Sequence, residues 1–77
     1  MASMKKSEVL KIIGLNIKKI RLEKGLTQVD LVGKIEAQID TTNISRIEKG
    51  RTNATIFTLF RISQALEVPL SKICKLN

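Results

Sequence analysis

A pair of short helical segments is encoded in residues 26–50, which read LTQVDLVGKIEAQIDTTNISRIEKG. Thr27 and Asp30 have the spacing of a capping box, in which the first residue bonds forward and the second reaches back, although Glu or Gln is more usual in the last place. The apolar residues that follow provide one short apolar side. These residues predict a helix over about 28–36.

A second short helix is predicted over about 41–49. Asp40 is a good N-cap, because a carboxylate oxygen can accept from the unpaired backbone N–H groups at the start of a helix. Ile44 and Ile47 are three residues apart and form the inward side of this helix, and Gly50 ends it. The two predicted helices are therefore joined by a turn.

The outward side of the second helix carries small or hydrogen-bonding residues and no acidic one. A helix with such a side can enter the major groove of DNA, where the edges of the base pairs present donors and acceptors. An arginine there can bond a guanine or a phosphate. We expect base contacts from Thr41, Thr42, Asn43, Ser45 and Arg46.

Residues on both sides of this helix are suited to phosphate contacts. Gln28 stands at the start of the first helix, where its amide and the backbone N–H groups could meet one phosphate together. Lys49, Arg51 and Asn53 follow the second helix and could hold the DNA backbone beyond it. We expect phosphate contacts from these four residues and from Thr27.

Outward from this pair, the spacing of apolar residues predicts three more helices and no sheet. The first runs over about 8–24, capped by Ser7 and ended by Gly25. Thr55 caps a later one, and Pro69 fits the first turn of a last short one. The sequence therefore predicts an all-α, compact five-helix bundle. Its expected core is Ile13, Ile17, Ile20, Leu26, Leu31, Ile35, Ile39, Ile44, Ile47, Ile56, Leu59, Ile62, Leu66 and Ile73.

Composition narrows the function class. The chain has 77 residues, 14 basic against 7 acidic, no His and one Cys. Such a positive excess favours polyanionic partners. Without His, acid–base and triad chemistry that depends on His is excluded, as are most zinc sites, so we expect no enzyme, no metal and no cofactor. No apolar run is long enough to span a membrane, no secretory leader is present and no small-molecule ligand is indicated, so we expect a cytoplasmic binding module.

The chain divides into a short stub and one domain. Met4 follows a polar stub that begins with Met1, so Met4 is expected to be the natural start. Residues 1–6 are expected to be a disordered N-terminal stub, and residues 7–77 a single domain. A chain of this size has room for only one small core.

Four fragments stand in the order and spacing of a known family. Together they resemble the phage repressor and Cro-type helix-turn-helix domains, over about residues 13–73. The fragments are Leu26-Thr27-Gln28, Leu31, Ile44-Ser45-Arg46-Ile47-Glu48-Lys49-Gly50, and Leu59…Ile62…Ala65-Leu66-Glu67-Val68.

The resemblance implies a lambda-repressor-like fold whose third helix reads the major groove. It places the family's base-reading positions at Thr41, Thr42 and Arg46, and its phosphate-binding glutamine at Gln28. It also implies an ion pair between the first and third helices, formed here by Arg21 and Glu48.

This chain departs from the family pattern in one connection. About two residues are added between Leu31 and Ile44, and they are expected near residues 36–39. The first of the paired helices is then longer, or the turn is wider.

These features predict a sequence-specific regulator of transcription that binds double-stranded DNA, as a homodimer on a two-fold operator. One short helix touches few bases, and two half-sites about 34 Å apart solve this. The C-terminal segment holds more apolar surface than one small core needs. Its candidate dimer interface is Val68, Leu70, Ile73 and Leu76.

Other interpretations stay open at this point. The same bundle could be a protein-interaction module whose basic side docks an acidic partner. Arg46 could contact phosphate only, and Thr41 and Thr42 could be ordinary first-turn residues. The pair of Arg21 and Glu48 could lie on the surface, where it would contribute under about 1 kcal/mol. Controller proteins of restriction–modification systems, antitoxin-like repressors and phage regulators are all small enough to match.

Overall fold

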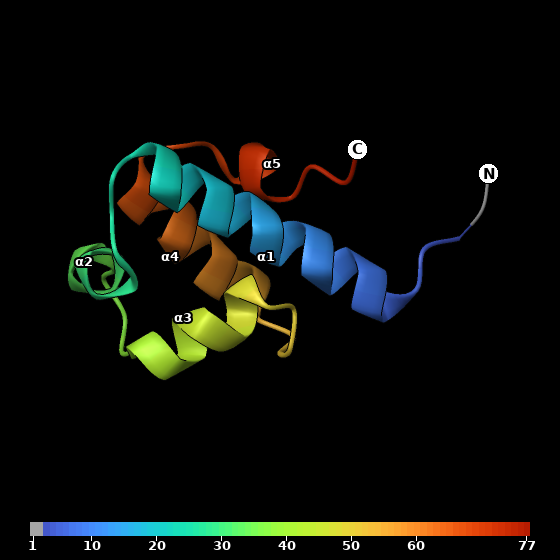
Figure 1. The fold of residues 1–77 in the computed structure, drawn as a ribbon, viewed down its shortest axis with the longest axis horizontal. Coiled ribbons are helices and arrows are strands. Elements are labelled where there is room, and N and C mark those ends of the chain that lie inside the picture. The colour runs from blue at the N-terminus through green and yellow to red at the C-terminus, as the bar shows by residue number, and fades with distance from the viewer. Residues whose placement is uncertain (1–2) are drawn as a thin grey trace.

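Five helices make up the part of the chain that the computed structural model describes, residues 3–77 (Figure 1). They are α1 (Lys6–Glu23), α2 (Gln28–Lys34), α3 (Thr41–Glu48), α4 (Ile56–Leu66) and α5 (Leu70–Ile73). Within these residues no strand forms and no helix has the length and apolar character needed to cross a membrane. The prediction of an all-α five-helix fold is confirmed.

Side-chain caps begin three of the helices where the sequence predicts them. The Thr27 hydroxyl accepts from the backbone N–H of Asp30 at 3.0 Å, which is one of the two hydrogen bonds of the capping box of α2. A carboxylate oxygen of Asp40 accepts from the backbone of Asn43 at 2.8 Å, and Thr55 caps α4. Each bond satisfies a donor that the first turn of a helix leaves unpaired.

Residues with a left-handed backbone end three of the helices. Gly25 follows α1 with φ of 71°, and Gly50 follows α3 with φ of 69°. Glycine adopts this conformation without the strain that a Cβ atom adds. After α4 the same position is occupied by Glu67, with φ of 58°. The chain therefore reverses sharply after each of these helices.

The start of α1 differs from the prediction. The helix begins at Lys6, because the carboxylate of Glu8 accepts the backbone N–H of Lys5 at 3.3 Å and stabilises a turn before Ser7. Lys6 therefore belongs to the helix and not to a disordered stub of residues 1–6. Residues 1 and 2 of that predicted stub lie outside the described part of the chain.

The connection between α2 and α3 is wider than the sequence suggested. The prediction ended the first of these helices at residue 36, but α2 ends at Lys34. Ile35 is extended, with φ of −86° and ψ of 126°, and its side chain is buried in the core. Burying this side chain stabilises the fold more than two further helical residues would, so residues 35–40 join the two helices and absorb the added length.

The core lies where the five helices meet. Ile56 was expected in it but is 67% exposed, because it is the first residue of α4 and helical side chains point back past the helix start. Ile13, Leu26 and Ile39 are half-buried at its edge. The buried core residues are Ile17, Ile20, Leu31, Ile35, Ile44, Ile47, Leu59, Ile62, Leu66 and Ile73.

Helix α1 packs against α3 and α5, while α2 packs against α3 and α4 (Figure 1). The approach of α1 to α3 depends on Gly14, which is buried. A Cβ atom at Gly14 would lie 2.6 Å from the carbonyl oxygen of Glu48 and closer still to that of Ile47. The missing side chain thus brings the backbones of the two helices together and fixes the position of α3 on the bundle.

Candidate nucleic-acid interface

Helix α3 presents a polar side to solvent. Ile44 and Ile47 are held in the core, and Glu48 is buried beside them. The five residues expected to contact bases all lie on the remaining surface. Thr42, Asn43 and Arg46 are exposed, and Thr41 and Ser45 are half-buried. No acidic side chain is exposed on this helix, so its surface does not repel a polyanion.

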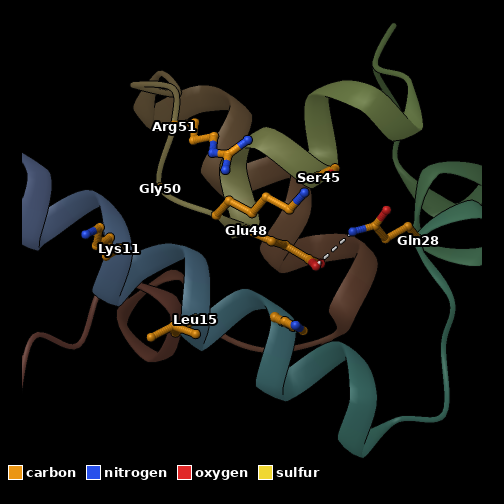
Figure 2. A pocket seen from close by; sticks show the side chains of 9 residues that line it. Lys11, Leu15, Gln28, Ser45, Glu48, Gly50 and Arg51 are labelled. Carbon is orange, nitrogen blue, oxygen red and sulfur yellow. Dashed lines mark hydrogen bonds between the residues drawn. The ribbon is translucent and has the colours of Figure 1, made fainter.

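The two flanks of α3 face different neighbours. Ser45 and Gln28 line the same groove on one flank (Figure 2). Asn43 and Asn53 line a separate pocket on the other flank, beside the turn that precedes α3. The expected site residues are therefore divided between two sides of the helix.

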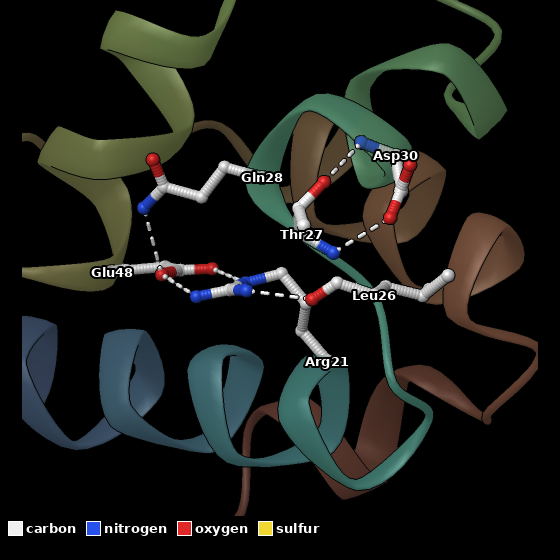
Figure 3. A network of polar contacts seen from close by, with 6 residues as sticks. All are labelled: Arg21, Leu26, Thr27, Gln28, Asp30 and Glu48. Carbon is white, nitrogen blue, oxygen red and sulfur yellow. Dashed lines mark hydrogen bonds and ion pairs between the residues drawn. The ribbon is translucent and has the colours of Figure 1, made fainter.

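A buried ion pair joins α1 to α3 (Figure 3). Arg21 Nε donates to Glu48 Oε2 at 2.7 Å, and a terminal guanidinium nitrogen donates to Glu48 Oε1 at 3.0 Å. The other terminal nitrogen donates to the carbonyl of Leu26 at 2.7 Å. The side chains of Arg21 and Glu48 are only 7% and 2% exposed. The bidentate geometry fixes the distance and angle between the two helices.

Gln28 extends this network from α2. Its amide nitrogen Nε2 donates to Glu48 Oε1 at 3.1 Å, and the residue is half-buried (Figure 3). An amide nitrogen carries two hydrogens, so one remains to bond a ligand. Glu48 therefore orients Gln28 as well as Arg21, a role that sequence reasoning did not assign.

The capping box at the start of α2 also affects a titratable group. The backbone N–H of Thr27 donates to Asp30 Oδ2 at 2.9 Å. This bond first, then the Thr27 side chain and the positive charge of Lys34, hold the pKa of Asp30 below its ordinary value. The carboxylate form of Asp30 is thus the form that the folded chain favours.

The polar residues after α3 that are expected to contact phosphates lie where the chain turns back. Lys49, Arg51 and Asn53 are all exposed. Lys49 and Arg51 line the groove that contains Ser45 and Gln28. Sequence reasoning missed that Lys11 and Lys18 of α1 line it as well. Their spacing of seven residues places them on one side of α1, but nothing in the sequence shows which element that side faces.

The predicted dimer residues differ in exposure. Ile73 is fully buried in the core, so it has no surface to offer a partner, and its place in the predicted interface is wrong. Val68 and Leu70 are half-buried, and Leu76 is 40% exposed. A different apolar surface lies on α4, where Ile56, Phe57 and Phe60 are 67%, 60% and 40% exposed.

Chemistry-bearing side chains do not gather elsewhere in residues 3–77. This part of the chain holds no group of three His, Cys, Asp or Glu residues placed to bind a metal ion. Cys74 is a half-buried free thiol at the end of α5.

Comparison with known proteins identifies the same elements. A family model described as HTH_3, helix-turn-helix, matches residues 17–73. An uncharacterized HTH-type transcriptional regulator, y4dJ of Sinorhizobium fredii (strain NBRC 101917 / NGR234), is 36% identical over 61 residues. The alignment covers 79% of this chain and 77% of that protein.

Solved structures share the fold. The wild-type restriction-modification controller protein C.Esp1396I is 48% identical with a TM-score of 0.72, over 79% of this chain and 77% of that chain. An HTH_3 family transcriptional regulator from Vibrio cholerae has a TM-score of 0.81 at 23% identity. That alignment covers 90% of this chain but only 38% of the Vibrio chain.

Proposed function

The chain belongs to the HTH_3 helix-turn-helix family, and from that membership we propose that it recognises a specific duplex sequence with α3 in the major groove. Proteins of this family are DNA-binding transcriptional regulators and not enzymes. The observation that carries the proposal is the acid-free exposed side of α3, which the buried pair of Arg21 and Glu48 holds in a fixed orientation.

Base reading falls to the exposed side of α3. Thr42 and Arg46 are four residues apart, so they project from the same side of the helix. Both are exposed, and Arg46 has five N–H donors for a guanine edge. Thr41, Asn43 and Ser45 contact the flanking bases.

Phosphate contacts position this helix over the bases. The second amide hydrogen of Gln28 donates to one phosphate, and Thr27 contacts another. Lys49, Arg51 and Asn53 contact the backbone at the other end of α3. Such contacts supply most of the affinity and make it depend steeply on salt.

The functional unit is a homodimer on a two-fold operator. Val68, Leu70 and Leu76 at the α5 end of the chain form its interface. Analytical ultracentrifugation of Leu76→Ser and of Phe57→Ser tests this assignment. Loss of the dimer in the first variant alone supports it. Loss of the dimer in Phe57→Ser alone would assign the interface to the apolar surface of α4. A wild type that stays monomeric at high micromolar concentration, both free and on DNA, would rule the dimer out.

Fluorescence anisotropy with a random-sequence duplex pool at two salt concentrations tests the DNA-binding surface. Arg46→Ala and Gln28→Ala are expected to weaken binding, whereas Lys72→Ala on α5 is the remote control with the same loss of charge as Arg46→Ala. On the selected operator, Arg46→Ala should lose about 5- to 150-fold in affinity and discriminate less at its base.

Two results would contradict the proposal in different ways. Salt-sensitive binding that is indifferent to Arg46 and Gln28 would show that the charge acts elsewhere on the bundle. No binding to duplex DNA at low salt would favour the alternative function, a module whose basic side docks an acidic protein.

Within the family, we propose the role of a restriction–modification controller protein. The 48% identity to C.Esp1396I over 79% of this chain supports this role above the antitoxin and phage-regulator alternatives. The selected operator should then lie upstream of restriction–modification genes in the same genome. An operator found only beside unrelated genes would rule the role out and leave the DNA-binding function intact.

A further inference from the structure

A basic groove lies between α1 and the C-terminal end of α3. Its volume is about 660 Å³, and its walls include four cationic residues, Lys11, Lys18, Lys49 and Arg51. Figure 2 shows Lys11 and Leu15 on the α1 wall, Ser45 and Arg51 on the opposite wall and Gln28 at one end. Two cations of this groove come from α1, a helix to which the proposal above assigns no contact with DNA.

Two glycines bring these cations together. At Gly14 the backbone of α1 lies directly against the end of α3. At Gly50 a Cβ atom would lie 2.8 Å from Lys11 Cα, so the turn after α3 also rests on α1. Lys11 and Lys18 stand three residues before and four residues after Gly14, which places them on the same side of α1 as the contact.

The groove carries an uncompensated positive charge. Its one acidic side chain, Glu48, is already paired with Arg21. Among residues 3–77, Lys11, Lys18, Lys49 and Arg51 make no side-chain hydrogen bond or ion pair.

The end of α3 cannot balance this charge. A helix C-terminus contributes only about half of one negative charge, against four positive ones here. Like charges within about 8–10 Å repel one another at ordinary ionic strength. A groove lined by one sign of charge also concentrates the field and attracts counter-ions. These cations are therefore arranged for an anion from outside the chain.

The neighbours of the groove indicate which anion it takes. Gln28 and Ser45 line the same groove, so it opens onto the surface proposed to contact DNA. A duplex that lies against α3 can therefore place one of its own phosphates in this groove. We propose that the groove binds a backbone phosphate of the operator duplex, with Lys11 and Lys18 of α1 as contacts additional to the helix-turn-helix. This inference rests on the proposed function.

The test compares two double variants that each remove two positive charges. Lys11→Gln with Lys18→Gln changes the groove, whereas Lys19→Gln with Lys72→Gln changes a separate pocket between α1 and α5. The slope of log affinity against log salt falls by about 0.9 for each phosphate that the protein no longer neutralises. Because the groove is proposed to hold one phosphate, the groove variant should lose about 0.9 from this slope and the control much less. Discrimination between operator and random duplex should remain as in the wild type.

Ethylation of single operator phosphates identifies the contact directly. Ethylation of one phosphate should weaken binding by the wild type and the control variant more than binding by the groove variant, which keeps only Lys49 and Arg51 as cations of the groove. Leu15→Glu is a second probe that keeps all the lysines. Leu15 is 60% exposed, so the change leaves the core intact, and the new carboxylate should weaken binding relative to Leu15→Gln.

The outcomes separate this inference from the function it rests on. Equal slopes for the two double variants, with Arg46→Ala still impairing discrimination, would overturn the groove contact and leave the regulator proposal standing. A wild type that binds no duplex at low salt would overturn both. If the groove variant has a lower melting temperature than the wild type, the test rests on the affinities of Leu15→Glu and Leu15→Gln for the operator. Equal affinities of these two variants would overturn the groove contact.

Discussion

Replacing Glu48 by alanine should destabilise this fold far more than replacing Glu23 by alanine. Both residues are glutamates, but Glu48 is 4% exposed and Glu23 lies on the surface at the end of α1. In Glu48→Ala the guanidinium of Arg21 keeps only its bond to the carbonyl of Leu26. A buried positive charge is then left without its counter-ion.

The expected loss follows from this geometry. Removing one partner of a buried, hydrogen-bonded ion pair costs about 3–5 kcal/mol. The bidentate bonds of 2.7 and 3.0 Å, with Gln28 as a further donor to Glu48, place this pair in that class. A domain of 77 residues has a free energy of unfolding of about 4–11 kcal/mol. The loss is therefore a large share of the whole stability.

Calorimetry or circular dichroism measures the effect as a change in melting temperature. A loss of about 3 kcal/mol corresponds to about 12 °C or more in a domain of this size. Glu23→Ala should remain within about 0.5 kcal/mol of the wild type. Arg21→Met with Glu48→Met should melt above Glu48→Ala, because removing both charges leaves neither one unpaired. Equal melting temperatures for Glu48→Ala and Glu23→Ala would refute the reasoning.

Three further changes test other parts of the fold. Asp30→Asn should lower the melting temperature above about pH 4, and the difference should shrink as the pH falls through the lowered pKa of Asp30; a difference that does not narrow as the pH falls below about 4 would contradict this. Gly14→Ala should cost about 1–3 kcal/mol or more, whereas Gly33→Ala, with open space around it, should add about 0.5–1 kcal/mol; melting shifts of the same sign would argue against the α1–α3 contact. Asn16→Ala removes two bonds of 2.8 Å to backbone carbonyls of residues 73–75, so amide exchange after α5 should accelerate. Unchanged exchange rates there would show that these bonds do not hold the C-terminus.

The sequence predicted correctly those helix ends that carry a side-chain cap or a glycine. Thr27, Asp40 and Thr55 begin α2, α3 and α4 as expected, and Gly25 and Gly50 follow α1 and α3. A cap depends on residues within three or four positions of each other, so its signal is local.

The predictions of burial and helix length failed at residues whose environment depends on contacts with other helices. Ile35 leaves the helix because its side chain reaches the core from an extended backbone. Ile56 fits the apolar spacing of α4 but lies before the part of the helix that is packed. Ile73 was assigned to both the core and the dimer surface, and its complete burial excludes the second. Periodicity shows that a residue is on an apolar side, but not how much of that side is covered.

For the candidate site too, the sequence predicted local features but not the contacts between helices. The sequence alone indicated an outward side of α3 without acidic residues and basic residues after the helix, because the surface of a short helix follows from its own residues. It did not show that Glu48 orients Gln28, or that Lys11 and Lys18 stand opposite Lys49 and Arg51.

The sequence by itself determined five helices, their caps, the positive charge and the polar surface of α3. Only the tertiary structure decided which surfaces of those helices meet. Backbone contact at Gly14 places α1 against the end of α3. The family resemblance implied the pair of Arg21 and Glu48, but the structure showed that it is buried and so fixes the orientation of the two helices. These contacts join residues far apart in the chain and depend on the close packing of all the helices at once. No local pattern of residues encodes that packing.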